Sequence, residues 1–329
     1  MLNPEAKLNP KIFDVDVEQK PIRDGYGEGL VIAGEQDKNV VVLCADLTES
    51  TRSEPFAKKF PERFIEIGVA EQNLATIAAG LGVSGKIPFI TSYAAFSPGR
   101  NWEQIRTTIS YNDSNVKIAG SHAGISVGPD GATHQAVEDM ATMRVMANMK
   151  VVAPCDVHEA RKATVAAAKI WGPVYMRFAR EKTPIITTPE TPFVPGKALI
   201  LWQSKKPDCA IIGCGPLLYQ SLVAAKELED EDIGTIVLDS HTVKPLDELK
   251  ILEVAKKCGA VVTVEEHQVT GGLGGAIAEL LAKKLPTPME FIGLQNTFGE
   301  SGSPTQLLEK YGMDAKAIKT AVKKVLRRK

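Results

Sequence analysis

The sequence has almost no net charge: 39 lysines and arginines stand against 40 aspartates and glutamates among its 329 residues. Without an excess of either sign there is no long-range field that would draw nucleic acid or an anionic membrane surface, so neither is expected as a partner. Basic residues gather only at the very end of the chain, where we interpret them as a solvated helix end. Any anion must therefore be bound by a local group of side chains.

Long apolar runs are also missing. No stretch approaches the roughly 20 apolar residues that a membrane-spanning helix requires. The segment from Met1 to Lys20 is polar and interrupted by prolines, without the apolar centre of a signal peptide. We expect a soluble, cytoplasmic protein.

Cysteines are few, and their spacing excludes the usual frameworks. The sequence has 5 of them, none in a Cys-x-x-Cys pair, and they lie in or beside apolar runs. This pattern predicts reduced thiols in the core rather than disulfides or a zinc site, so no metal-binding residues are expected. Two other signatures fail as well: no Walker A motif occurs, and the Gly-x-Ser-x-Gly pattern at Gly124–Gly128 is followed by Pro129 rather than by a helix.

What the sequence does contain is a regular alternation of β-branched apolar runs, such as Val40–Cys44, with segments of helical periodicity. Helices are expected over Ile22–Glu35, from about Trp102 to Ile109 and from about Gln135 to Met146. This alternation predicts two consecutive α/β domains, each a mainly parallel sheet flanked by helices. Four prolines between Thr183 and Pro195 indicate an extended linker. We expect an N-terminal extension over residues 1–20, a first domain over 21–183, a linker over 184–195 and a second domain over 196–329.

Polar residues follow several of the expected strands of the first domain. Asp46 and Ser50 come after its first strand, and Arg180 comes after its last. Glu71 lies in the first turn of a helix, where an acid commonly does no more than complement the helix dipole. Since ligands bind outside the carboxyl ends of parallel strands, we expect a cation, hydroxyls and carboxylates to meet at one edge, as a polyol phosphate requires.

The loop from Ser121 to Gln135 is rich in glycine and holds two of the 5 histidines, His122 and His134. Glycines of this density let the backbone approach a ligand, so we interpret the loop as part of a site. Tyr93 and Phe96 follow another strand, and both core packing and stacking on a ligand remain open for them.

Three motifs together resemble the transketolase family: Cys44-Ala45-Asp46-Leu47-Thr48, Gly68-Val69-Ala70-Glu71-Gln72-Asn73 and Asp130-Gly131-Ala132-Thr133-His134-Gln135. The resemblance covers nearly the whole chain, but only the family's second half, its pyrimidine-binding domain and C-terminal domain. The family's diphosphate-binding domain, with its Gly-Asp-Gly motif for Mg²⁺, has no counterpart here. The resemblance thus implies the C-terminal subunit of a split transketolase, in a two-fold heterotetramer with an N-terminal subunit that supplies the diphosphate and Mg²⁺ site.

The resemblance also implies residue roles around thiamine diphosphate. Glu71 becomes the acid that contacts N1′ of the aminopyrimidine and favours the imino tautomer, whose N4′ removes the proton from thiazolium C2. Tyr93 and Phe96 become the aromatic residues that stack on the same ring, and Asp46 becomes a cofactor-proximal acid. The implied reaction passes a two-carbon ketol unit from a ketose phosphate to an aldose phosphate, as in the pentose phosphate pathway.

On the substrate side, the resemblance makes His122 and His134 contact the donor sugar and assist proton transfers, for which imidazole suits neutral pH. It makes Asp130 recognise a sugar hydroxyl. The residues implied for binding the substrate phosphate are Arg23, Ser50 and Arg180.

The sequence departs from long single-chain transketolases at Gly99, where they have a further aromatic residue, and at Ala123, where they have an aspartate. Ala70-Glu71-Gln72 is similar to deoxyxylulose-phosphate synthases. The nearest alternative is the β subunit of a 2-oxo acid dehydrogenase E1, which has the same two domains and a comparable length, and half of a deoxyxylulose-phosphate synthase is a third choice. A non-catalytic regulatory subunit is the alternative from another class, and the presence of Glu71 argues against it.

Overall fold

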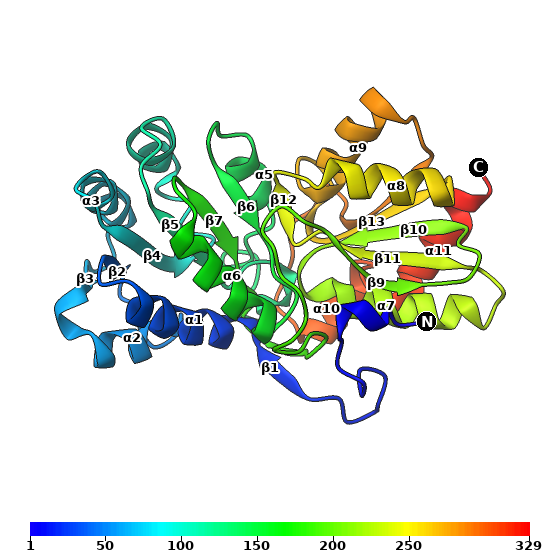
Figure 1. Ribbon diagram of the computed structural model, residues 1–329, viewed down its shortest axis with the longest axis horizontal. Coiled ribbons are helices and arrows are strands. Elements are labelled where there is room, and N and C mark those ends of the chain that lie inside the picture. The colour runs from blue at the N-terminus through cyan, green and yellow to red at the C-terminus, as the bar shows by residue number, and fades with distance from the viewer.

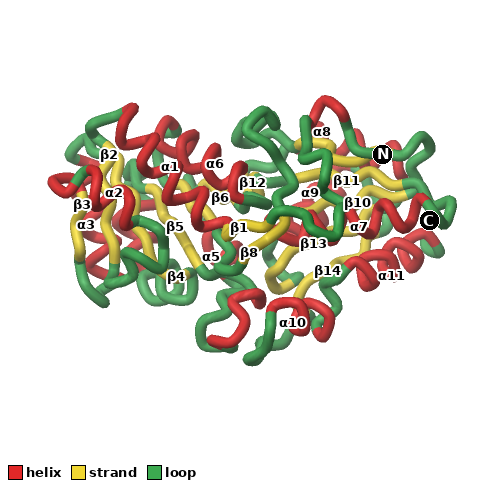
Figure 2. The backbone as a smooth tube through the Cα atoms, turned by 90° about the horizontal axis from the view of Figure 1, so that it is seen from below, coloured by secondary structure: helices red, strands yellow, loops and turns green.

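Two sheets lying side by side along the long axis organise the chain in the computed structural model, which describes residues 1–329. Helices lie on both sides of each sheet (Figure 2). Both ends of the chain lie with the second domain (Figure 1). The predicted fold class, two consecutive α/β domains with mainly parallel sheets, is confirmed.

The first sheet has seven strands in the order β12-β6-β7-β5-β4-β2-β3, and every neighbouring pair is parallel except β12 and β6. The strands β2, β5 and β7 are buried along their whole length. For β2 this burial is what its continuous β-branched and apolar run predicts. The bounds are β2 (Val40–Cys44), β3 (Phe64–Glu66), β4 (Ile87–Tyr93), β5 (Lys117–Ser121), β6 (Lys150–Val152), β7 (Val174–Arg177) and β12 (Thr242–Lys244).

One face of this sheet packs against α1 (Ile22–Gln36) and α6 (Val157–Lys169), and the other against α3 (Glu71–Val83) and the π-helix η3 (Ile105–Ser110). The helices α1 and α6 approach closely because α1 carries glycine at the crossing. A Cβ atom on Gly25 would lie 2.0 Å from the carbonyl oxygen of Val157. The shorter helices are α2 (Glu54–Lys59), α4 (Trp102–Gln104) and α5 (Asp139–Arg144).

The second sheet has five strands in the order β14-β13-β10-β11-β9, of which only β9 runs antiparallel to its neighbour. Its strands are β9 (Leu199–Gln203), β10 (Cys209–Gly213), β11 (Thr235–Asp239), β13 (Val261–Gln268) and β14 (Met289–Leu294). Its helices are α7 (Leu218–Glu229), α8 (Glu248–Cys258), α9 (Leu273–Lys284), α10 (Pro304–Lys310) and α11 (Ala315–Leu326). None of the chain's helices combines the length and the apolar character needed to cross a membrane.

The two domains are joined more extensively than the sequence predicts. One apolar core runs continuously from the first domain into the second. The strand β12 comes after β11 in the chain, yet it pairs with β6 of the first sheet. At the N-terminus, Ala6 and Ile12 are buried in the core of the second domain. The short strand β1 (Gln19–Pro21) pairs with β8 (Lys182–Pro184), so the start of the chain is tied to the start of the proline-rich segment.

Two predicted helices differ from the observed ones. The helix expected from Gln135 to Met146 is the shorter α5, because the Gln135 side chain donates to the carbonyl oxygens of Ile125 and Glu300, both at 3.0 Å, and holds this segment in a turn. The helix expected from Trp102 to Ile109 divides into α4 and the π-helix η3. All five cysteines are unpaired and buried, so the prediction that they lie in the core is confirmed.

Candidate active site

The loops that follow β2, β4, β5 and β7 come together at the carboxyl edge of the first sheet, as the parallel order of these strands requires. They carry most of the residues that the sequence predicts for a site. Three clusters occupy this edge: a buried acid at the start of α3, a row of aromatic and imidazole rings, and a group of arginines. We describe them in that order.

Glu71 is the first residue of α3, and its side chain is 2% exposed. Its Oε2 lies 2.7 Å from Nη1 of Arg100, so the carboxylate forms an ion pair with this arginine. The Asn101 side chain donates to the carbonyl oxygen of Glu71 at 2.9 Å. No side chain caps this helix start, so the carboxylate of Glu71 is placed by the helix and by the Arg100–Asn101 segment.

Glu66, at the end of β3, organises the loops beside Glu71. Its Oε1 accepts from the backbone N–H groups of Asp46 at 2.7 Å and Gly68 at 2.9 Å, and its Oε2 accepts from the Thr48 hydroxyl at 2.9 Å. Glu66 was not predicted from the sequence. A signal was available, since Glu66 is an acid at the carboxyl end of an expected strand, two residues before Gly68, and the structure gives that glycine a positive φ of 78°.

A continuous row of ring contacts, which we call the ring row, crosses the edge of the sheet. The guanidinium of Arg100 lies 4.8 Å from the ring centroid of Phe96, and Phe96 stacks on Tyr93 at 6.0 Å. Tyr93 stacks in turn on His122, with 3.8 Å between the ring centroids. His134 meets Phe96 edge-on at 5.5 Å. The ring row therefore runs from the neighbour of Glu71 to His122.

His122 is 1% exposed and adopts a positive φ of 55°. Burial, together with the positive charges of Arg23 and Arg180, lowers the pKa of His122 to about 2, so the imidazole is neutral. Nε2 lies 3.2 Å from Nη1 of Arg23, and arginine can only donate, so Nε2 accepts. The proton then sits on Nδ1, which donates to Ser121 Oγ at 2.9 Å.

The arginines Arg23, Arg52 and Arg180 surround His122 with positive charge. Arg23 donates from Nη1 to the carbonyl oxygen of Ser50 at 2.6 Å, whereas its Nε is buried without an acceptor. Burial lowers the pKa of Arg23, and the charges of Arg52 and Arg180 add to this effect. A buried donor without a partner among like charges is what an anion would satisfy.

Arg52 was missed from the sequence, because nothing in the local pattern distinguishes it. Arg52 lies two residues after Ser50 and adopts a positive φ of 66°. Its Nε lies 2.7 Å from Oδ1 of Asp24. Arg180 pairs with Asp130 at 3.1 Å, so these two predicted residues lie together.

The histidine loop, residues 121–135, is held in place by contacts with the second domain. Glu266, near the end of β13, accepts with Oε1 from the backbone N–H of Ser126 at 2.5 Å. Arg177 donates to the carbonyl oxygens of Ala136 at 3.2 Å and Glu266 at 2.8 Å. The loop that carries both histidines is therefore positioned by residues far away in the sequence.

Most of the predicted site residues are thus brought together. Ser50 accompanies Arg23, and its hydroxyl lies 2.7 Å from the Tyr93 hydroxyl. Asp46 is the exception: its side chain is exposed and forms no ion pair or side-chain hydrogen bond with another predicted site residue.

Comparisons with known proteins agree with this architecture. Residues 18–185 match the family model of the transketolase pyrimidine-binding domain, and residues 196–318 match that of the transketolase C-terminal domain. The chain belongs to the transketolase family.

Similar proteins of the same length exist. A putative transketolase C-terminal section from Methanocaldococcus jannaschii is 44% identical over 91% of this chain and 94% of its own length. A 6-deoxy-6-sulfo-D-fructose transketolase subunit from Clostridium sp. is 39% identical over 96% and 98%. A solved split-gene transketolase, described as an inactive β4 tetramer, has a TM-score of 0.87 at 46% identity, covering 93% of this chain and 98% of that one. Against mammalian transketolases, the chain spans 48% of their length.

Proposed function

We propose that this chain is the C-terminal subunit of a split, thiamine-diphosphate-dependent transketolase that transfers a two-carbon ketol unit between phosphosugars. The observation that carries the proposal is the ring row, which links the neighbourhood of the buried acid Glu71 to the arginines around His122 through Phe96 and Tyr93. The ring row has a buried acid and aromatic faces at one end, and a positively charged site that can bind an anion at the other.

The residues present fit the aminopyrimidine half of thiamine diphosphate. The Glu71 carboxylate is buried, and its ion-pair partner Arg100 is half-exposed, so a ring nitrogen could take that partner's place. Phe96 and Tyr93 offer nearly parallel aromatic faces, with 22° between their planes, for contact with a flat heterocycle. When bound, the cofactor supplies the electron sink needed to break and re-form the carbon–carbon bond. Glu71 would hold N1′ of the ring, while Asp46 remains a cofactor-proximal candidate at the exposed rim.

The chain spans about half the length of single-chain transketolases. Two relatives are named as a C-terminal section and a split-gene transketolase, and these names support a two-chain enzyme. We therefore propose that a separate N-terminal subunit holds the diphosphate and its Mg²⁺, and that the two kinds of chain form a two-fold heterotetramer.

The arginines would hold the anionic end of the sugar. The unpartnered Nε of Arg23 and the partly exposed guanidinium of Arg180 can donate to a terminal phosphate, with Ser50 beside them. One relative is named for a sulfonated sugar, and a sulfonate offers the same oxygen acceptors. We infer a substrate class of sugars with a terminal oxyanion, of which the phosphosugars of the pentose phosphate pathway are the first to test.

The histidines would act on the sugar hydroxyls near the reacting carbon. His134 is partly exposed, with Nδ1 2.9 Å from the Thr133 hydroxyl, and it can accept or donate a proton at Nε2. His122 is neutral, and it becomes available to a hydroxyl only if Arg23 turns from its Nε2 toward an anion. Asp130, paired with Arg180, is placed to accept from another hydroxyl.

The test is reconstitution. This chain is co-expressed with a chain carrying the diphosphate-binding domain, and ketol transfer from xylulose 5-phosphate to ribose 5-phosphate is assayed with thiamine diphosphate and Mg²⁺. We expect activity only with both chains, and loss of activity in Glu71→Ala. Full activity of this chain alone would contradict the two-chain enzyme, and unchanged activity of Glu71→Ala would contradict the role of Glu71.

The same reconstitution separates the alternatives. Turnover of pyruvate with an acceptor dye but not of xylulose 5-phosphate would indicate a 2-oxo acid dehydrogenase. Condensation of pyruvate with glyceraldehyde 3-phosphate would indicate a deoxyxylulose-phosphate synthase. A folded complex without any of the three activities would indicate a regulatory subunit.

A further inference from the structure

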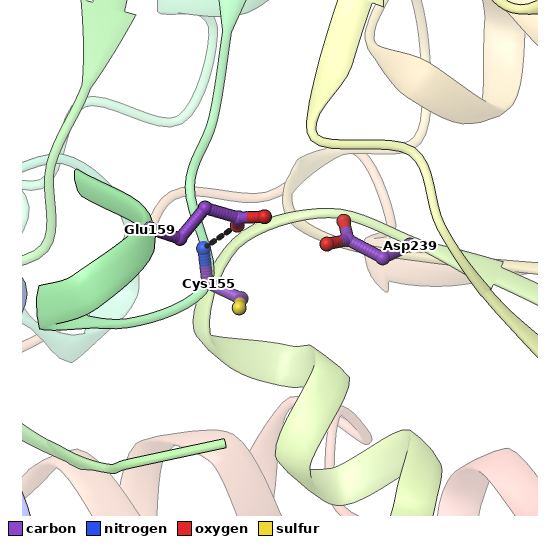
Figure 3. Close-up of side chains that lie close together, drawn as sticks. All are labelled: Cys155, Glu159 and Asp239. Carbon is purple, nitrogen blue, oxygen red and sulfur yellow. Dashed lines mark hydrogen bonds between the residues drawn. The ribbon is translucent and has the colours of Figure 1, made fainter. Parts of the chain in front are cut away.

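A second polar cluster lies at the junction of the two domains, apart from the ring row. It consists of Cys155, which follows β6, Glu159 of α6 in the first domain, and Asp239, the last residue of β11 in the second domain. The sulfur and one carboxylate oxygen from each acid lie within 4.8 Å of one another. All three side chains are buried, at 0%, 2% and 0% exposure respectively. In Figure 3 the two carboxylates point toward each other, with the sulfur beside them.

The carboxylate of Asp239 has no hydrogen-bond partner. Both of its carboxylate oxygens are buried without a hydrogen-bond donor. The neighbouring Asp156 shows the contrast: its oxygens accept from the N–H groups of Glu159, Ile186 and Thr187 and from the Thr187 hydroxyl. Both oxygens of Asp156 thus accept hydrogen bonds, whereas the Asp239 carboxylate points toward Glu159 and accepts none.

No side-chain cation neutralises this pair. Lys162 directs its ammonium group to the carbonyl oxygens of Thr188 and Thr191, at 2.7 and 2.6 Å. The ring of His241 packs on Phe193, and its Nδ1 lies 2.9 Å from the Thr242 hydroxyl. None of the ion pairs in the structure includes Glu159 or Asp239. Two buried carboxyl groups in contact must therefore share a proton or hold a cation.

The presence of Cys155 favours a cation. A shared proton needs only the two carboxyl groups, whereas one thiolate sulfur and two carboxylate oxygens make a donor set for a borderline-soft divalent metal. Glu159 is already held in place for such a role, because one of its oxygens accepts from the Cys155 backbone N–H at 2.7 Å. We propose that Cys155, Glu159 and Asp239 bind a zinc-class divalent cation that fastens the two domains together.

Binding requires the thiolate and both carboxylates, so the thiol proton and the proton shared by the acids are released to solvent. The fourth position of a tetrahedral site would be filled by the second Asp239 oxygen or by water. No sequence pattern predicts this site, because Cys155 stands outside any Cys-x-x-Cys pair and Asp239 comes from the other domain.

The test uses the untagged full-length chain, stripped of metal under reducing conditions and titrated with Co²⁺ and Zn²⁺. We expect about one Zn²⁺ per chain, a thiolate-to-cobalt charge-transfer band, and a thermal midpoint that rises with Zn²⁺. Cys155→Ser should abolish the charge-transfer band, and the near-isosteric Asp239→Asn should weaken binding at least tenfold. The matched control is Cys214→Ser, which removes another buried cysteine and should keep the band.

Two results would overturn the proposal. One is a wild-type chain with no charge-transfer band and far less than one Zn²⁺. The other is metal binding that persists in both Cys155→Ser and Asp239→Asn, which would assign it to other side chains, such as the partly exposed His134 or His158. In either case, a protonated-carboxyl infrared band that disappears in Asp239→Asn and is unaffected by Zn²⁺ would identify a shared proton instead. Wild-type and variant chains should all be checked for native circular dichroism, and Asp239→Asn decides the matter if Cys155→Ser does not fold.

Discussion

Glu71 and Arg100 form an ion pair in which only one partner is buried: Oε2 and Nη1 are 2.7 Å apart, with the side chains 2% and 49% exposed. The arginine also lies over the face of Phe96. The acid at the start of α3 is therefore compensated partly by the helix dipole and partly by a cation that borders on solvent. The Glu71 carboxylate is therefore stabilised in the free chain, and its exposed partner can still be replaced by another hydrogen-bond donor.

Replacing Arg100 by glutamine should destabilise the free chain by about 1 kcal/mol, because the buried Glu71 carboxylate loses its partner but the exposed guanidinium was well solvated. The loss should be largely absent when Glu71 is already glutamine. Chemical denaturation of the two single variants and the double variant measures this coupling. Arg106→Gln, which changes an exposed arginine on the neighbouring π-helix, is the control and should have little effect. Additive effects of the two changes would show that the pair is not energetically coupled.

The loss of folding stability at acid pH should depend on His122. Its pKa in the folded chain is about 2, against an ordinary value of 6.5, so below about pH 6.5 the unfolded chain takes up a proton that the folded chain does not. Stability should thus be fully present above pH 6.5 and should fall as the pH drops, by up to about 1.4 kcal/mol per pH unit from this group.

In His122→Asn this part of the slope should disappear between pH 6 and pH 4, as measured by urea unfolding at several pH values. Imidazole ¹⁵N shifts provide an independent check, since the His122 ring should remain in its neutral Nδ1–H form while the half-exposed His158 titrates. A His122 ring that titrates near pH 6.5 would contradict the buried, neutral assignment.

The sequence was sufficient to place Glu71, Tyr93, Phe96 and His122 at one edge, because their positions after strands are a local property and parallel strands bring their carboxyl ends together. The fold class was accessible for the same reason. Alternation of β-branched runs with helical periodicity specifies the order of elements without any knowledge of tertiary contacts.

What the sequence could not predict depends on contacts between distant segments. Arg100 and Glu266 look like ordinary charged residues until the fold brings them to Glu71 and to Ser126. The strand β12 was missed because a short segment of the second domain completes the sheet of the first. The start of α5 was misplaced because Gln135 forms hydrogen bonds to carbonyls of Ile125 and Glu300, and the latter is 165 residues away.

The arginines make a prediction about substrate preference in the reconstituted enzyme. Arg180→Ala should raise KM for phosphorylated sugars by about 10- to 100-fold, the loss expected for a hydrogen bond between charged groups, and should change KM for unphosphorylated sugars much less. Arg161→Ala is a matched control, because Arg161 lies on the surface of α6 and pairs with Glu28. Equal effects of Arg180→Ala on both kinds of sugar would contradict an anion-binding role.

Glu266 should control the order of the histidine loop from the second domain. Its carboxylate is the acceptor for the Ser126 N–H, and a side chain on Gly124 would collide with it, since a Cβ there would lie 2.4 Å from Oε1. In Glu266→Ala the Ser126 amide loses its acceptor, so its hydrogen exchange should accelerate about tenfold or more relative to amides of the core. Glu266→Gln keeps an acceptor and should restore much of the protection.

The neighbouring Glu265 is a stringent control for this effect. It accepts from the N–H groups of Leu273 and Gly274, both at 2.8 Å, and so holds the start of α9 rather than the loop. Glu265→Ala should lower overall stability and speed exchange in α9 without selectively exposing Ser126. In the reconstituted enzyme, Glu266→Ala should lower kcat for both phosphorylated and unphosphorylated sugars, because the loop carries the two histidines. A change confined to KM for phosphorylated sugars would instead place Glu266 with the anion site.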